Sequence, residues 1–288
     1  MAETLETLLA GPGLLVVPGA HDALSARIAA RAGARAVYMS GFGVVGASFG
    51  VPDIGLIGPE PMIERVGAIA SAIAPLPLIA DGDNGHGGPP EAARLARAYE
   101  RAGAQCIQIE DQVSPKRCGH LEGKAVIGRE EAAMKIRAAA EARENKRFKI
   151  MARTDARATH GLDEALGRGE AFLRAGADIL FVEAPQSEAE LRKIGETFSG
   201  TPLLANLVED GKTPWASRAA LEAFDFKIAL YPISALLAVA ERLERSYRNV
   251  LSPEFAGEIQ RATFAHYNEI AGLPAFLDRA GEGGNDDS

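Results

Sequence analysis

Apolar runs recur along the chain at nearly even intervals, and each run has the length of one buried strand. They show no strict alternation with polar residues, as expected for strands covered on both faces of a parallel sheet. The eight runs are residues 14–19, 36–41, 77–83, 106–111, 148–155, 179–185, 202–209 and 227–232. The pattern therefore predicts an α/β fold with a parallel sheet.

The segments between these runs have the helical period. In residues 89–103, for example, Ala92, Leu95, Ala96 and Tyr99 fall on one helix face, with prolines at the start and a glycine at the end. Eight strand–helix units predict a (β/α)8 barrel of the TIM type. A doubly wound open sheet is the alternative, but it usually has fewer strands and a glycine-rich first turn.

Two further helical runs follow the last strand, at residues 233–250 and 253–272. The first completes the eighth unit, so we expect a catalytic barrel over residues 1–250. Residues 251–288 are then a C-terminal extension with an extra amphipathic helix and a flexible tail. Such a helix needs a surface that covers its apolar face, either on its own barrel or on a neighbouring subunit.

Composition narrows the class of protein. The net charge of −8 argues against a nucleic-acid partner, because phosphate binding depends on clustered Lys and Arg. The two cysteines, Cys106 and Cys118, are too few for a disulfide framework. The N-terminus lacks the basic start of a secretory signal, and no apolar run approaches the ~20 residues that cross a bilayer. We therefore expect a cytoplasmic protein that binds no membrane.

Polar residues gather where the predicted strands end, which is where barrel enzymes place their chemistry. The third strand ends in Asp81 and Asp83, the fourth in Glu110 and the fifth in Arg153. Acids two positions apart on a strand end point the same way, and oxygen-only ligands favour Mg²⁺, with Mn²⁺ as a substitute. Any one of these acids could instead cap a helix or pair with a cation, but three on adjacent strands indicate a metal site.

The stretch SPKRCGHLEGK, residues 114–124, follows the fourth strand in a long connection that is typical of an active-site lid. Zinc binding by its cysteine and histidine would be two ligands short. A solvated basic loop with a bystander thiol is the other alternative. We interpret the stretch as a lid that brings positive charge and a proton donor to an anionic substrate, since a thiol with a pKa of about 8.5 is mostly protonated at neutral pH.

Several of these segments together resemble one enzyme superfamily. VYMSGFGV, VPDIGL, PLIADGDNGHG, IQIEDQVSPKRCGH, IMARTDAR and ILFVEAP resemble the isocitrate lyase and phosphoenolpyruvate mutase superfamily over residues 14–234. KRCGH resembles the signature of the branch that breaks carbon–carbon bonds. The resemblance implies a Mg²⁺-dependent enzyme for a small anionic carboxylic acid, and a homotetramer that exchanges its terminal helix between subunits.

The resemblance also implies roles for individual residues. It implies that Asp53 joins Asp81, Asp83 and Glu110 around the metal. Catalytic roles are implied for Cys118, Arg153, His120 and Tyr38. The substrate site is implied to include Ser40, Gly41, Phe42, Lys116, Arg117, Gly119, Glu183 and Asn206.

The expected reaction is the cleavage of a 2-hydroxy dicarboxylic or tricarboxylic acid, of the 2-methylisocitrate or substituted-malate type. Its products are an α-keto acid such as pyruvate and a second carboxylate. LANLVEDGKTPW also resembles a phosphonomutase of the carboxyvinyl-carboxyphosphonate type, which stays as an alternative. An oxaloacetate-type hydrolase or decarboxylase is a further alternative, and a non-catalytic scaffold is the different class.

Overall fold

The computed structural model describes residues 3–117, 119, 123–257 and 259–282. Its eight strands are β1 (Leu15–Ala20), β2 (Val37–Met39), β3 (Leu78–Asp81), β4 (Cys106–Glu110), β5 (Lys149–Thr154), β6 (Ile179–Val182), β7 (Leu204–Asn206) and β8 (Ile228–Tyr231). All pairs are parallel, in the order β6-β5-β4-β3-β2-β1-β8-β7. A parallel bridge between Leu180 and Leu203 joins β6 to the segment before β7 and nearly closes the ring. The predicted (β/α)8 barrel is confirmed.

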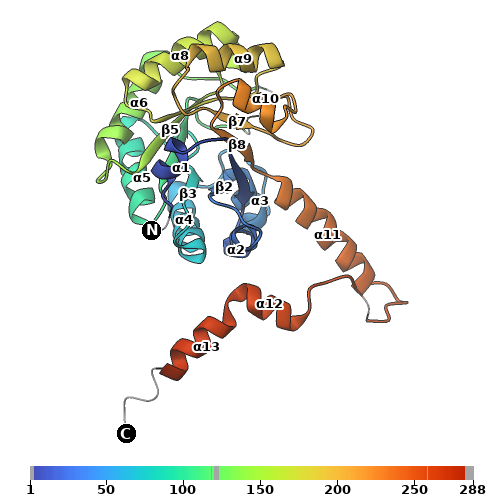
Figure 1. The fold of residues 1–288 in the computed structure, drawn as a ribbon. Coiled ribbons are helices and arrows are strands. Elements are labelled where there is room, and N and C mark those ends of the chain that lie inside the picture. The colour runs from blue at the N-terminus through green and yellow to red at the C-terminus, as the bar shows by residue number, and fades with distance from the viewer. Residues whose placement is uncertain (1–2, 118, 120–122, 258, 283–288) are drawn as a thin grey trace. The chain divides into compact units, whose positions relative to one another are not determined.

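Helices follow the strands and surround the ring (Figure 1). Those up to the last strand are α1 (Leu5–Ala10), α2 (Ala23–Arg31), α3 (Gly41–Phe49), α4 (Pro59–Ile73), α5 (Pro89–Arg101), α6 (Arg129–Ala142), α7 (Ala156–His160), α8 (Leu162–Arg174), α9 (Glu188–Thr197) and α10 (Arg218–Ala223). Helix α3 follows β2 directly, because the Ser40 hydroxyl accepts a hydrogen bond from the Gly43 N–H and caps the helix. The strands are shorter than the apolar runs that predicted them, so Asp83, Asp155 and Glu183 lie just past strand ends.

Side chains along each strand alternate between two apolar layers. The inner layer fills the barrel and includes Val17, Ile79, Cys106, Met151 and Phe181. Leu5 and Leu8 of α1 belong to the same layer, where they close one end of the barrel. Because the alternation continues to the strand ends, residues two or four positions further along also face the interior. On β4 these are Gln108 and Glu110.

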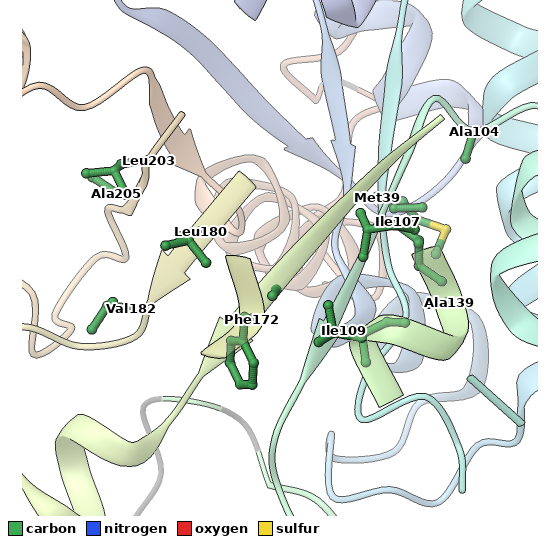
Figure 2. Packing of buried hydrophobic residues seen from close by; sticks show 14 of the residues in the cluster. Met39, Ala104, Ile107, Ile109, Ala139, Phe172, Leu180, Val182, Leu203 and Ala205 are labelled. Atoms are coloured by element: carbon green, nitrogen blue, oxygen red, sulfur yellow. The ribbon is translucent and has the colours of Figure 1, made fainter. Parts of the chain in front are cut away.

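The outer layer packs between the strands and the surrounding helices. It contains Met39, Ile107, Ile109, Leu180 and Val182 from the strands (Figure 2). Each of these residues alternates along its strand with a residue that faces the interior. Because the outer face is packed against helices, only the inner face can present polar groups to the mouth of the barrel. A shift of one residue in register would exchange the two faces.

The chain divides into two units, Met1–Leu236 and Leu237–Ser288. The helices near and beyond the division are α11 (Ser234–Val250), α12 (Phe264–Ala271) and α13 (Leu273–Glu282). The predicted helical run at residues 253–272 is wrong in its first half, because the described residues before Phe264 in that run are not helical. None of the helices in the described part of the chain is long and apolar enough to cross a membrane.

Candidate active site

The strand ends enclose a cavity of about 260 Å³. Twelve of the residues that the sequence predicts for the site line it: Tyr38, Ser40, Phe42, Asp53, Asp81, Glu110, Lys116, Arg117, Gly119, Arg153, Glu183 and Asn206. These residues come from strands β2 to β7, from the start of helix α3 and from the loops that follow the strands. The barrel therefore brings together groups that are as far as 168 positions apart in the chain.

Lys116 lies between two aspartates at this cavity. Its Nζ is 2.5 Å from Asp53 Oδ1 and 2.7 Å from Asp83 Oδ1, and 6% of its side chain is exposed. Burial alone would lower the pKa of Lys116, but Asp83, Glu110 and Asp53 together raise it. Burial raises the pKa of Asp83 to about 6, although Lys116 opposes this shift. The ammonium group thus offsets negative charge at the position where the sequence predicts a metal ion.

Asp81 is held by three donors. The Gly41 N–H donates to its Oδ2 at 3.2 Å, the Asp83 N–H to its Oδ1 at 3.1 Å, and Gln108 Nε2 to the same Oδ1 at 3.0 Å. Gln108 in turn accepts a hydrogen bond of 2.7 Å from the Tyr38 hydroxyl. Burial raises the pKa of Tyr38 well above its usual range, so this phenol is neutral at physiological pH. Gln108, which the sequence prediction did not include, therefore connects Tyr38 to the acid group.

The acids suit a hard divalent cation in their chemistry, because every donor is an oxygen. Oε1 of Glu110 is buried and has no hydrogen-bond partner among the described residues. Burial raises the pKa of Glu110 well above its usual range, although Arg153 opposes the shift. Among the described residues, no group of three or more Asp, Glu, His or Cys side chains is arranged so that it could hold a metal ion. Lys116 occupies the space between two of the acids in this arrangement.

Arg153 is fixed by three carboxylates. Its Nε lies 2.9 Å from Asp155 Oδ2 and 3.3 Å from Glu110 Oε2, and its Nη2 lies 3.1 Å from Glu183 Oε2. The guanidinium also stacks 5.0 Å from the centre of the Phe181 ring. Burial would lower the pKa of Arg153, but the carboxylates raise it well above its usual range. The residue is therefore a permanent, oriented cation at the cavity wall.

The loop after β4 reaches this arginine through Gly119. A Cβ built on Gly119 would lie 2.2 Å from Arg153 Nη2 and 2.9 Å from Glu183 Oε2, so any larger residue would have to displace these side chains. Lys124 holds the same segment, since its Nζ bonds the carbonyl of Gly119 and lies 2.8 Å from Asp155 Oδ1. The predicted lid thus lies over the cavity at the residues that are described.

Two predicted catalytic residues, Cys118 and His120, lie outside the described residues. Asp83 is described but does not line the cavity; it contacts Lys116 and, at 3.6 Å, His86 Nε2. Gly41 likewise lies beside the cavity and not in its wall, with its N–H already bonded to Asp81.

The structure adds wall residues that the sequence did not indicate. They are Phe181, Val208, Leu230, Pro232 and Ile233, of which four follow or belong to β7 and β8. Glu209, an acid at the end of the seventh predicted strand, lies in the same wall. In the sequence these apolar residues are indistinguishable from strand residues of the core. Their position at the end of a barrel strand was the one available signal, and it applies to functional and structural residues alike.

This barrel, with acids and an arginine at the strand ends and a basic loop over them, defines a class of enzymes. A family model described as phosphoenolpyruvate phosphomutase matches residues 5–251, and the chain belongs to this family. A 2,3-dimethylmalate lyase of Eubacterium barkeri is 42% identical over 274 residues, which cover 94% of each chain. A 2-methylisocitrate lyase of Bacillus subtilis is 42% identical over 247 residues, covering 86% of this chain and 80% of the relative.

Solved structures agree with this assignment. Oxaloacetate acetylhydrolase in complex with 3,3-difluorooxalacetate superposes with a TM-score of 0.94 at 31% identity, covering 100% of this chain and 98% of the other. Phosphonopyruvate hydrolase in complex with oxalate and Mg²⁺ gives a TM-score of 0.81 at 29% identity, covering 98% and 97%. Two hydrolases of known structure thus share this architecture.

Proposed function

We propose that this protein is a carbon–carbon lyase that cleaves a 2-hydroxy dicarboxylic or tricarboxylic acid to an α-keto acid and a second carboxylate. The main observation that supports the proposal is that Gly119 of the loop lies against Arg153 in a cavity lined by acids. The two lyases that are each 42% identical to the chain support the same reaction class.

We propose Mg²⁺ as the cofactor, with Mn²⁺ as a substitute. Asp81, Asp83, Glu110 and Asp53 would hold it, and the unpartnered Oε1 of Glu110 supports this set. The related phosphonopyruvate hydrolase was solved with Mg²⁺. A bound divalent cation would supply Lewis acidity and stabilise negative charge on the reacting oxygen.

The protein's own residues would supply the rest of the electrostatics. Cleavage requires loss of the proton from the 2-hydroxyl, rupture of the C2–C3 bond, and delivery of a proton to the electron pair left on C3. Arg153 is a fixed cation that would stabilise the negative oxygen at C2 without reorganising, since three carboxylates already orient it. Ser40 and Phe42 would border the keto acid half, because both line the cavity beyond β2.

The lid would contribute the proton and exclude water. We propose that Cys118 donates the proton to C3, and that Lys116, Arg117 and His120 surround the leaving carboxylate. Glu183 and Asn206 line the wall beside Arg153, where Asn206 Nδ2 donates to Glu183 Oε2 at 3.1 Å. The neutral hydroxyl of Tyr38 donates a hydrogen bond to Gln108. We therefore propose that the Tyr38 oxygen accepts a hydrogen bond from the substrate and so helps to position it.

The test is a panel of substituted malates, 2-methylisocitrate and oxaloacetate, assayed with Mg²⁺ for release of pyruvate, glyoxylate or oxalate. We expect pyruvate from at least one 2-hydroxy acid, and loss of turnover in excess chelator that Mg²⁺ or Mn²⁺ restores. Oxalate and acetate from oxaloacetate, with no cleavage of any 2-hydroxy acid, would instead establish a hydrolase. Full activity in excess chelator would remove the metal from the proposal.

We further propose a cytoplasmic homotetramer. Helix α11 buries none of its residues, and Leu243, Tyr247 and Leu251 are 48%, 64% and 80% exposed along it and at its end. Apolar surface of this extent favours association with a second copy of the chain. Light scattering at micromolar concentration should give a multiple of the 30.3 kDa chain mass, and a monomer mass would refute the assembly.

A further inference from the structure

The cavity has two unlike walls. In the eight-stranded ring, β7 and β8 lie opposite β3 and β4. The β3–β4 side carries Asp81 and Glu110, and the loop after β4 adds Lys116 and Arg117. The β7–β8 side is formed by Asn206, whose amide donates to Glu183, by Val208, Leu230, Pro232 and Ile233, and by the side chain of Glu209. Charge compensation is therefore concentrated on one side of the cavity.

Among the described residues of the β7–β8 wall, the only ionisable side chain is a carboxylate. Glu209 Oε1 accepts a hydrogen bond from the Ser234 hydroxyl. Its Oε2 is buried and has no hydrogen-bond partner among the described residues. An anionic substituent facing this wall would lose its hydration beside a like charge, whereas an alkyl group would meet Val208 and Leu230.

We propose that the substrate is a 2-hydroxy dicarboxylate with a short alkyl group on C3, and that this apolar wall selects it over analogues with a third carboxylate. The inference rests on the proposed lyase activity and names its substrate class. Two substrate carboxylates can be compensated by Arg153 and the basic loop. A third carboxylate would have to face Val208, Leu230 and Glu209, where no described side chain offers a positive charge.

Two compounds test the wall directly. 2,3-Dimethylmalate and 2-methylisocitrate differ at C3 only in a methyl group against a carboxymethyl group. In both, loss of the hydroxyl proton and rupture of C2–C3 gives pyruvate, and the electron pair left on C3 takes up a proton. The other product is propionate or succinate, so one pyruvate assay measures both. We expect kcat/KM for 2,3-dimethylmalate to exceed that for 2-methylisocitrate by roughly 100-fold or more.

Two variants assign the preference to the wall. Val208→Thr adds a hydroxyl and Glu209→Gln removes the like charge, so each should narrow the preference by about 10-fold. Glu196→Gln, at an exposed position on α9, is the matched control and should leave the ratio unchanged. A structural defect would lower kcat/KM for both substrates together and leave their ratio constant. The two variants alter different residues, so the failure of one to fold leaves the other as a test.

The outcomes separate this inference from the lyase proposal. Equal or faster cleavage of 2-methylisocitrate by the wild type overturns the inference and leaves the lyase intact. An unchanged ratio in both variants also overturns it, because the wall would then not set the preference. Absence of pyruvate from both compounds, together with absence of any α-keto acid from every other 2-hydroxy acid, overturns the lyase proposal and this inference together.

Discussion

Replacing Lys116 by methionine tests the electrostatics of the acid group most directly. The substitution keeps an unbranched side chain of similar length and removes the charge between Asp53 and Asp83. Both carboxylates are buried, at 6% and 5% residue exposure, so water compensates them poorly. We therefore expect Lys116→Met to be strongly destabilising in the absence of divalent cations.

The magnitude follows from the loss of one partner of a buried ion pair, which costs about 3–5 kcal/mol. A change of 1 kcal/mol moves the midpoint of a domain of this size by roughly 2–4 °C, so Lys116→Met should lower Tm in chelator by roughly 6–20 °C. A divalent cation bound by the same carboxylates would compensate them. At a concentration of 100 Kd it contributes about 2.7 kcal/mol. Because the ammonium no longer competes for the acids, Mg²⁺ should raise the Tm of the variant more than that of the wild type.

The assay is thermal unfolding of both proteins in excess chelator and across a Mg²⁺ titration. Lys193→Met, at an exposed position on α9, is the control and should stay within ~0.5 kcal/mol of wild type. The reasoning fails if Lys116→Met is as stable as wild type in chelator. It also fails if Mg²⁺ raises both midpoints equally, because Lys116 and the metal ion would then not compete for the same carboxylates.

Three further changes probe the lid and the arginine. Gly119→Ala places a methyl group against Arg153 Nη2, so turnover should fall by about 100-fold while circular dichroism stays native; normal turnover would show that the loop tip does not need this contact. Cys118→Ser raises the pKa of the donor, so kcat should fall by about 100-fold with little change in inhibition by the keto acid; a loss within a factor of about three would remove the thiol from the mechanism. Burial would raise the pKa of Asp155, but Arg153 and Lys124 lower it to about 2, below the value in the unfolded chain. Its ionised form therefore stabilises the fold above about pH 4, and about 2 kcal/mol is lost as the pH falls toward 2. Urea unfolding should show this dependence in wild type but not in Asp155→Asn, and equal slopes would contradict it.

The sequence was sufficient to predict the barrel, because each strand is a separate apolar run and each helix has its own period. It also located the acids, since position at a strand end is a local property. The sequence could not show which of these side chains form ion pairs with one another. Lys116 was assigned to the substrate, yet it pairs with Asp53, 63 positions earlier, and that contact depends on how two loops meet above the strands.

The apolar wall was missed for a related reason. Leu230 alternates with core residues on β8, and its side chain faces the interior as that of Ile228 does. Whether such a residue packs in the core or lines a cavity depends on its height in the barrel relative to the other strands. That height is set by the register between strands, which a single strand does not encode.

Two cations of the site, Arg153 and Lys116, differ in how firmly they are held, and this difference constrains any mechanism. Arg153 is on a strand, contacts three carboxylates and stacks on Phe181, so its position does not depend on the loop. Lys116 is on the loop and contacts acids of two other segments. A fixed cation can stabilise charge that develops at one place in every turnover. Charge that must respond to the arrival of a metal ion or a substrate has to come from the loop, which is why Lys116→Met tests this response.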